Sequence, residues 1–245
     1  MHVLLKVQYD GTNYSGFQRQ LNAVTVQEKL EDALFQVFGH KIGVIAASRT
    51  DAGVHALGQR VSFFAKNIRV PVVKLPYVIN THLPPDVSVV GSQEVPIGFN
   101  PRFDAKFKTY TYGFYQAPFH NPLKSRYSVF VPKQLDIMAM SLAAGFFVGK
   151  HDFAAFCATG GSQKTTVREV YSCTFCASCD DTAKLTITGS GFLYNMVRII
   201  AGTLYYVGIG KISAHSIPGI IKSRKRICAG KTMPPHGLVL VEVEY

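Results

Sequence analysis

Six prolines lie between residues 71 and 101, at positions 71, 76, 84, 85, 96 and 101. Proline has a fixed φ and no backbone N–H, so a stretch this rich in proline favours connections over a central strand or a long helix. Only a short helix near Leu75 to Asn80 fits within it. We therefore expect the chain to fold as two parts, an N-terminal subdomain over residues 1–104 and a C-terminal subdomain over residues 105–245.

The N-terminal part begins with a strand pattern. Apolar and more polar residues alternate from Val3 to Tyr9, and a polar loop with two glycines follows over 10–16. Thr25 and Glu28 form a capping box, and apolar residues at helical spacing continue from there to a glycine at 39. These signals predict a helix that starts after Thr25 and is closed by the glycine.

The C-terminal part opens with an alternating, aromatic-rich segment, Phe107 to Tyr115, which is typical of a strand. Pro132 suits the first turn of a helix, so we expect a helix from about this residue, with an apolar face made by Leu135, Met138, Leu142 and Phe146. The remaining expected elements are strands around Cys173 and over 184–188, helices over 193–207 and ending near Arg226, and a terminal strand over 238–245.

Each half thus mixes antiparallel strands with one or two helices. Helices that cover one face of such a sheet give an α+β arrangement. We expect two subdomains of mixed, mainly antiparallel sheet, each with its helices packed on one face.

The chain is basic, with 26 Lys and Arg against 15 Asp and Glu, a net charge of +11 and a pI near 9.5. This surplus predicts a polyanionic partner, and nucleic acid is the natural candidate. One possible contact patch consists of Lys222, Arg224, Lys225 and Arg226, although a solvated helix end explains it as well. No apolar run is long enough to span a bilayer and no signal peptide is evident, so we expect a cytoplasmic protein without a membrane partner.

Three of the five cysteines, Cys173, Cys176 and Cys179, have the spacing C-x-x-C-x-x-C. The spacing resembles metal sites, but no second Cys or His pair completes a tetrahedral set. In a strand, Cys173 and Cys176 would also face opposite sides. We therefore expect small buried hydrophobic residues and no metal.

A carboxylate, Asp51, lies in the irregular segment Ser48-Arg49-Thr50-Asp51-Ala52-Gly53 between two apolar runs. Asp and Gly favour turns, so this segment reads as a loop between strands. Loops on a rigid scaffold are where catalytic groups concentrate, although Asp is also a common turn residue in its own right. The loop alone leaves both interpretations open.

Arg198 lies in a helical segment with apolar neighbours on nearly every side. A buried guanidinium without a partner costs several kcal/mol, so we expect an acidic group within reach. Asp51 is one candidate, because an adjacent cation keeps a carboxylate ionised. A structural ion pair with another acid, or a side chain that reaches the surface, remains an equal alternative.

Tyr110, Tyr112 and Tyr115 share one expected strand. Aromatic side chains on a sheet can stack on nucleobases, but at least two of these three are expected to pack in the core. His55 in the Asp51 loop has a similar ambiguity. We expect it to be bonded to nearby backbone and assign it no proton-transfer role.

Several linked motifs together resemble the bacterial tRNA pseudouridine synthase A family over essentially the full chain. They include Tyr9-Asp10-Gly11-Thr12, Gly16-Phe17-Gln18-Arg19-Gln20, Arg49-Thr50-Asp51-Ala52-Gly53-Val54-His55-Ala56, Gly58-Gln59, Phe99, Arg102-Phe103, Lys108 to Tyr112, Gly149 to Phe153, Gly191 to Arg198 and Ala229 to Leu238. The departures from the usual family pattern are Phe17, Ser48 and Asn100-Pro101. They affect the expected substrate fit more than the expected activity.

The resemblance implies the pseudouridine synthase fold with an active-site cleft between the two subdomains, and isomerisation of uridine in tRNA. It further implies Asp51 as the catalytic aspartate, Tyr110 as the aromatic residue near the target base and Arg198 as the basic partner of Asp51. Arg49 is expected to fill the space left by the flipped base or to hold a phosphate. Family members act as homodimers on the 3′ side of the anticodon stem-loop, at tRNA positions 38–40.

The chemistry implied by the resemblance needs neither a redox step nor an activated donor, so no cofactor is expected. One ionised carboxylate can suffice, because a uracil anion can leave largely unassisted, whereas glycoside hydrolysis usually needs two carboxylates. Two alternatives stay open at this point. The chain could be an RNA-binding protein without catalysis, or a nucleoside hydrolase that releases free uracil.

Overall fold

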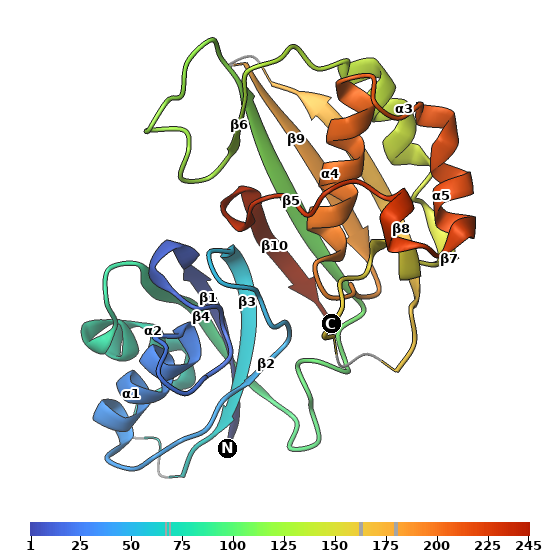
Figure 1. Cartoon of the computed structure of the whole chain (residues 1–245). Helices are drawn as coiled ribbons and strands as arrows, with labels where there is room; N and C mark the ends of the chain where they lie inside the picture. The colour runs from blue at the N-terminus through green and yellow to red at the C-terminus, as the bar shows by residue number, and fades with distance from the viewer. Residues whose placement is uncertain (67, 69, 162–163, 179–180) are drawn as a thin grey trace. The chain divides into compact units, whose positions relative to one another are not determined.

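A computed structural model of the chain describes residues 1–66, 68, 70–161, 164–178 and 181–245. The chain forms two compact units, which we call unit 1 and unit 2 (Figure 1). Unit 1 comprises Met1–Lys106 together with Leu240–Tyr245, and unit 2 comprises Phe107–Val239. Among the described residues, none of the helices has the length and apolar character needed to cross a membrane.

Unit 1 is built on an antiparallel sheet in which β1 (His2–Tyr9) lies between β3 (His55–Phe64) and β4 (Val87–Val95). The short strand β2 (Ile45–Ala46) pairs with β3, and the terminal strand β10 (Leu238–Glu244) follows β3 in the strand order. Strands β1 and β3 supply the core of the sheet, because most of their residues are buried.

Two α-helices accompany this sheet, α1 (Val26–Phe38) and the single-turn α2 (Leu75–Ile79). The predicted start of α1 is confirmed, because the Thr25 hydroxyl caps the helix by accepting a hydrogen bond from the Glu28 backbone N–H at 3.3 Å. Gly39 ends the helix in the left-handed conformation, with φ of 73°. The short helix expected near Leu75 is also present. Three-residue 3₁₀ turns flank these elements at Gly11–Asn13, Val72–Lys74 and Asn80–His82.

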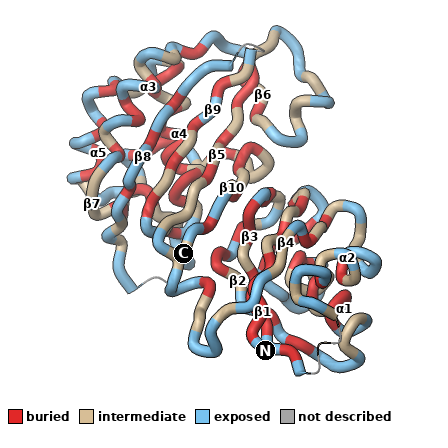
Figure 2. The backbone as a smooth tube through the Cα atoms, turned by 180° about the vertical axis from the view of Figure 1, so that it is seen from behind, coloured by how far each residue is buried: buried red, intermediate tan, exposed pale blue. Residues whose placement is uncertain are grey.

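Unit 2 contains the strand order β5-β9-β8-β7, antiparallel throughout. The strands are β5 (Phe107–Gln116), β7 (Gly149–Asp152), β8 (Val167–Ala177) and β9 (Thr182–Gly189), and β6 (Val129–Val131) pairs with β5 in parallel. Three helices lie on one face of this sheet, and the opposite view has the strands in front (Figures 1 and 2). They are α3 (Ile137–Gly145), α4 (Met196–Gly208) and α5 (Ile217–Ser223).

Each unit therefore combines a mainly antiparallel sheet with helices, and the predicted α+β class is confirmed. Short 3₁₀ turns connect the elements of unit 2 at Ala154–Phe156, Ala214–Ser216, Arg226–Cys228 and Pro235–Gly237. The buried residues follow the sheets and the inner helix faces (Figure 2).

The prediction for α3 was wrong in its start and in its buried face. The helix begins at Ile137, because the Asp136 carboxylate accepts from the Ala139 N–H at 2.9 Å and so caps it. Its buried residues are Met140, Ala143 and Ala144, whereas Met138 is 85% exposed. The apolar residues are spread almost evenly around this helix, so the sequence spacing alone could not identify the packed face.

The cysteines on β8 have opposite environments. Cys173 is buried and Cys176 is exposed, as expected for residues on opposite faces of one strand. The interpretation as buried hydrophobic residues therefore holds for Cys173 and is wrong for Cys176. Burial raises the pKa of the Cys173 thiol to about 12. The third cysteine of the motif, Cys179, lies outside the described residues.

Candidate active site

Asp51 lies in the loop that joins β2 to β3, and its side chain is half-buried. The loop makes a tight turn here, since the Asp51 carbonyl accepts a hydrogen bond from the Val54 N–H at 3.2 Å. Gly53 within this turn has φ of +76°, a conformation that favours glycine. The expectation of a turn at Asp51 is thus correct, and the question is what holds the turn in place.

The segment 14–17 anchors the backbone of the loop on both sides of Asp51. The Phe17 N–H donates to the Thr50 carbonyl at 3.0 Å, and the Gly53 N–H donates to the Tyr14 carbonyl at 3.2 Å. Gly16 has φ of +93°, and a Cβ atom there would lie 2.7 Å from the Thr50 carbonyl oxygen. This close approach of two backbone segments therefore requires glycine at position 16.

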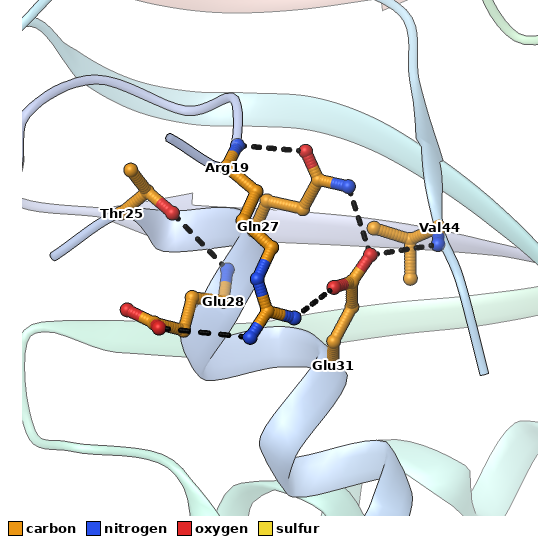
Figure 3. Close-up of polar contacts among 6 residues, drawn as sticks. All are labelled: Arg19, Thr25, Gln27, Glu28, Glu31 and Val44. Atoms are coloured by element: carbon orange, nitrogen blue, oxygen red, sulfur yellow. Dashed lines mark hydrogen bonds and ion pairs between the residues drawn. The ribbon is translucent and has the colours of Figure 1, made fainter. Parts of the chain in front are cut away.

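Polar contacts with helix α1 fix the adjoining segment in turn (Figure 3). Gln27 accepts from the Arg19 backbone N–H at 3.0 Å and donates to Glu31 at 2.8 Å. The Arg19 guanidinium also donates to Glu31 at 2.8 Å, and Glu31 accepts from the Val44 N–H at 3.3 Å. The Gln27 N–H donates to the Phe17 carbonyl, so the residue that anchors Thr50 is itself tied to the helix.

Buried side chains hold the loop from the sheet below it. The Gln59 amide donates to the Ser48 carbonyl at 2.7 Å and accepts from the Ser48 N–H at 3.2 Å. The Tyr9 hydroxyl lies 2.7 Å from the Thr50 hydroxyl. In the sequence, Tyr9 and Gln59 stand out only as parts of motifs, and these roles were missed. Strand β3 also contains His55, Arg60 and Ser62, so a polar residue at position 59 was no distinct signal.

His55 is bonded to backbone, as expected. Its Nδ1 atom accepts from the Gly11 N–H at 3.0 Å and lies 3.1 Å from an oxygen of Asp10. In the neutral ring Nδ1 accepts from Gly11, whereas a protonated ring would donate to Asp10 instead. His55 and Asp10 therefore join the loop to the end of β1.

Arg198 lies in the first turn of α4 and is half-buried. Its Nε atom donates to the Met233 carbonyl at 2.8 Å, and one terminal nitrogen donates to the Asn195 side chain at 2.6 Å. Both acceptors are neutral oxygens, so these contacts fix the direction of the guanidinium without neutralising its charge. Asn195 precedes the helix in the left-handed conformation, with φ of 59°.

The segment 226–233 that supplies the Met233 carbonyl packs tightly on α4. A Cβ atom at Gly202 would lie 1.8 Å from the Lys231 carbonyl oxygen, so helix and segment make backbone contact. The Arg226 guanidinium donates to the Gly230 carbonyl at 2.8 Å and to the Thr232 hydroxyl at 3.1 Å. The acceptor for Arg198 therefore lies in a segment that is packed on α4 and hydrogen-bonded within itself.

Tyr110 lies on β5 opposite Ile187 of β9, and its ring meets Phe192 edge to face, with centroids 5.2 Å apart. Tyr112 and Tyr115 are both fully buried, which confirms the expectation that at least two of the three tyrosines belong to the core. The Tyr112 hydroxyl donates to the Pro234 carbonyl at 2.7 Å, and burial raises its pKa above the ordinary range. Tyr110 keeps 8% of its surface exposed.

In the basic patch near the end of α5, the two arginines have contacts within the protein and the two lysines are exposed. Arg224 pairs with Asp152 at 3.0 Å, and Arg226 bonds within its own segment. Lys222 and Lys225 are exposed. A groove of about 850 Å³ in unit 2 is lined by residues that include Lys222, Arg224 and Asp152. Both arginines of the patch thus have structural contacts, which are an ion pair and hydrogen bonds within one segment rather than the solvated helix end considered for the patch.

The structure places Arg49 and Asp51 in the same loop of unit 1, with Arg49 exposed. Tyr110 and Arg198 both belong to unit 2. The pairing of Asp51 with Arg198 joins residues of different units and stays a prediction. Within the described part of the chain, no three His, Cys, Asp or Glu side chains are grouped so that they could hold a metal ion.

A family model described as tRNA pseudouridine synthase matches residues 6–104 and 143–245. Two curated relatives are both called tRNA pseudouridine synthase A. The protein from Ruminiclostridium cellulolyticum is 47% identical over 243 residues, which cover 99% of this chain and 99% of the relative. The protein from Acetivibrio thermocellus is 48% identical over 244 residues, which cover 100% of this chain and 99% of the relative.

Among solved structures, an archaeal box H/ACA sRNP Nop10–Cbf5 complex matches 83% of this chain and 44% of that chain, with 8% identity and a TM-score of 0.39. A likeness this weak carries no argument, and the assignment rests on the sequence matches. They confirm the resemblance that the linked motifs predicted. The chain belongs to the tRNA pseudouridine synthase family.

Proposed function

We propose that the chain converts uridine to pseudouridine on the 3′ side of the tRNA anticodon stem-loop, with Asp51 as the catalytic aspartate and without a cofactor. Membership of the family supplies the reaction class, an isomerase that acts on tRNA. The observation that supports the role of Asp51 is the way its loop is held. Asp51 is half-buried, and the carbonyl and the hydroxyl of the preceding residue, Thr50, are both hydrogen-bonded.

The reaction is an internal rearrangement of one nucleotide. The bond from N1 of uracil to C1′ of the ribose breaks, the base turns, and a bond from C5 to C1′ forms. C5 loses its proton to solvent, and N1 takes up a proton. The formal reduction at C1′, which exchanges a bond to nitrogen for one to carbon, is balanced by the oxidation at C5, which exchanges a bond to hydrogen for one to carbon. The rearrangement is therefore redox-neutral and needs neither a redox partner nor an activated donor.

Asp51 can assist in either of two ways. As a nucleophile, its carboxylate attacks C1′ while the uracil anion leaves. As a base, it removes a proton from the ribose to give a glycal. Both routes need the ionised carboxylate, and neither needs a second acid, because the uracil anion leaves largely unassisted.

We propose that Arg198 keeps Asp51 ionised and directs it toward the sugar. A guanidinium suits this task because it stays protonated and presents several donors in a fixed plane. Its contacts with Asn195 and Met233 use neutral acceptors and orient it in advance. A preoriented charge stabilises the anionic carboxylate without reorganisation during the reaction.

Tyr110 is proposed to contact the target base, since its ring is held by Phe192 and keeps a small exposed area. The base must leave the helical stack first, at a cost of a few kcal/mol. Arg49 is two residues from Asp51 and exposed. We propose that it fills the vacated space or holds a neighbouring phosphate.

The net charge of +11 fits binding to the RNA backbone, and Lys222 and Lys225 are the exposed cations proposed to contribute from unit 2. Binding should then weaken with salt in proportion to the phosphates contacted. We also propose a homodimer that acts in the cytoplasm. Sedimentation of the free protein and of its tRNA complex would measure the oligomeric state.

The function is tested by mapping pseudouridine in tRNA from cells with and without the gene. The proposal predicts loss of pseudouridine from the 3′ side of the anticodon stem-loop and from no other region. The purified protein should modify such a tRNA without added cofactor or change in mass. Release of free uracil would indicate a nucleoside hydrolase, and binding without modification would indicate an RNA-binding protein.

A further inference from the structure

We infer that Gln59 is a positioning residue that sets the geometry of Asp51 from beneath the loop, together with Tyr9 and Thr50. The inference rests on the proposed catalytic role of Asp51. It extends that role to three residues of unit 1 that do not themselves act on the substrate.

The register shows where the Gln59 side chain meets the loop. Ile45 pairs with Ser62 and Ala46 with Val61, and the Ala47 N–H then donates to the Arg60 carbonyl at 2.8 Å. The next two residues in this register are Ser48 and Gln59. At that rung, the side-chain amide of Gln59 both donates to and accepts from the Ser48 backbone.

The ladder itself offers Ser48 no partner on β3. Ala47 and Arg60 form a hydrogen-bonded pair, so in the alternation of an antiparallel ladder the next pair, Ser48 and Gln59, makes no backbone hydrogen bond. The Gln59 side-chain amide instead supplies a partner for both the Ser48 N–H and the Ser48 carbonyl, two buried groups that need one. The path toward Asp51 is therefore fixed by one side chain.

Gln59 is fully buried, which makes the arrangement costly to disturb. Its oxygen accepts from Ser48 and from the Arg60 N–H at 3.2 Å, and its nitrogen donates to Ser48 and to the Tyr9 hydroxyl at 3.4 Å. A buried amide with its donors and acceptors satisfied specifies one conformation. An apolar side chain of the same size would leave Ser48 unsatisfied.

Tyr9 carries the constraint from Gln59 to the residue before Asp51. Its hydroxyl bridges the Gln59 amide and the Thr50 hydroxyl, and both Tyr9 and Thr50 are buried. Thr50 is also held at its carbonyl by Phe17. The backbone that leads into Asp51 is thus fixed at residues 48 and 50, while Arg49 between them projects to the surface.

The chain offers a control in the same unit, an amide clamp made by Asn80, which is exposed rather than buried. The Asn80 side chain clamps Val89 of β4 in the same way, with its nitrogen donating to the Val89 carbonyl at 2.9 Å and its oxygen accepting from the Val89 N–H at 2.8 Å. Asn80 contacts neither the Asp51 loop nor its anchors in any of these bonds. Removing it tests the loss of an amide clamp as such.

The experiment compares Gln59→Met with Asn80→Leu in the purified full chain, acting on the tRNA that the wild type modifies. We expect Gln59→Met to lower kcat by about 10-fold to 100-fold with KM for tRNA changed by less than about threefold, because a misplaced group loses transition-state stabilisation and leaves substrate binding intact. Asn80→Leu should leave both constants within about twofold of wild type, whatever its effect on the melting temperature.

A second pair of variants, at Thr50, tests the inference if Gln59→Met does not fold. Thr50→Val removes the hydroxyl that Tyr9 contacts and keeps the shape of the side chain, whereas Thr50→Ser keeps the hydroxyl. We expect Thr50→Val to lower kcat by about 10-fold and Thr50→Ser to restore it to within about threefold of wild type.

The inference is overturned if folded Gln59→Met, or Thr50→Val where Gln59→Met does not fold, keeps the wild-type kcat, or if Asn80→Leu loses as much. An Asp51→Asn arm separates this result from a failure of the proposed function. If Asp51→Asn is inactive while Gln59→Met turns over normally, only the positioning role is wrong. If Asp51→Asn is active, the proposed catalytic role of Asp51 fails first.

Discussion

The two units hold their predicted site residues in different ways. In unit 1, Asp51 sits in an irregular loop with no helix or strand to orient it, and contacts from β1, β3 and the segment 14–17 fix that loop. In unit 2, Arg198 and Tyr110 sit on α4 and β5, whose regular backbone already directs them. A catalytic carboxylate on a loop needs many anchors, whereas a residue on a regular element needs few.

The difference predicts where each half is vulnerable. Orientation in unit 1 is shared among several buried residues, so losing any one of them should cost part of the activity. Orientation in unit 2 comes from the regular backbone of α4 and β5, so substitution of Arg198 or Tyr110 itself should have the largest effect there. The following variants test this contrast, starting with the largest expected effect.

Arg198→Met should lower kcat by about 100-fold or more, because it removes the charge proposed to keep Asp51 ionised. Arg226→Met is the matched control, since Arg226 also donates two hydrogen bonds to the segment 226–233. It should lose stability but keep most of its activity. Equal loss of turnover in the two variants, measured under single-turnover conditions, would show that Arg198 only holds that segment.

Tyr110→Leu should lower activity by about 10-fold to 100-fold, because stacking on a base contributes about 1–3 kcal/mol. Tyr112→Phe serves as the control. Tyr112 lies on the same strand as Tyr110, and the substitution removes its buried hydrogen bond to the Pro234 carbonyl. It should cost about 1 kcal/mol of unfolding free energy with little change in turnover. Denaturant melts and initial rates on the same preparations distinguish the two. If Tyr110→Leu turned over like wild type, its proposed contact with the base would be wrong.

If the exposed guanidinium holds a phosphate, Arg49→Ala should weaken tRNA binding by a few fold. The slope of log affinity against log salt concentration should then become shallower by about one. If the guanidinium instead fills the space of the flipped base, turnover should fall with the salt slope unchanged. Binding titrations at several salt concentrations separate these results. An unaltered affinity together with an unaltered rate would remove Arg49 from the site.

Asp152 in unit 2 provides a small stability effect away from the predicted site residues. A hydrogen bond from Thr166, followed by contacts from the Ala154 N–H and Arg224, lowers the pKa of this carboxyl. A lowered folded-state pKa adds stability above the unfolded value of about 3.9, and this stability is lost as the pH falls through the folded value. Thr166→Val should therefore be less stable than wild type at pH 7.

The stability difference between Thr166→Val and wild type should shrink below about pH 4, as the carboxyl becomes protonated. Denaturant titrations across this range measure it. A difference that does not change with pH would mean that Thr166 acts through packing alone. We expect this to be the smallest effect among the variants, because Thr166 and Asp152 are not among the predicted site residues.

Local signals in the sequence predicted much of the fold. The capping box at Thr25, the glycine at the end of α1 and the alternation in β1 and β5 are all short-range patterns, and the corresponding elements formed as expected. The start of α3 was missed because Asp136 caps it after Pro132, and its apolar residues do not mark one face. Which face packs depends on tertiary contacts that spacing does not report.

The sequence allowed the residues of the site to be predicted, but not the contacts that hold them in place. The motif around Asp51 and the helix arginine stand out because charge in such surroundings is unusual. The clamp by Gln59 joins residues 11 positions apart through a side-chain amide, and the Tyr9 contact with Thr50 spans 41 positions. Neither pairing leaves a periodic signal, so the structure was needed to find them.

The central claim is that one carboxylate, held on the loop of unit 1, drives the isomerisation. Its most direct test is tritium release from tRNA carrying C5-labelled uridine, with wild type compared with Asp51→Asn. We expect the variant to fold, to bind tRNA as wild type does, and to release no tritium above background. Substantial tritium release by Asp51→Asn would contradict the account.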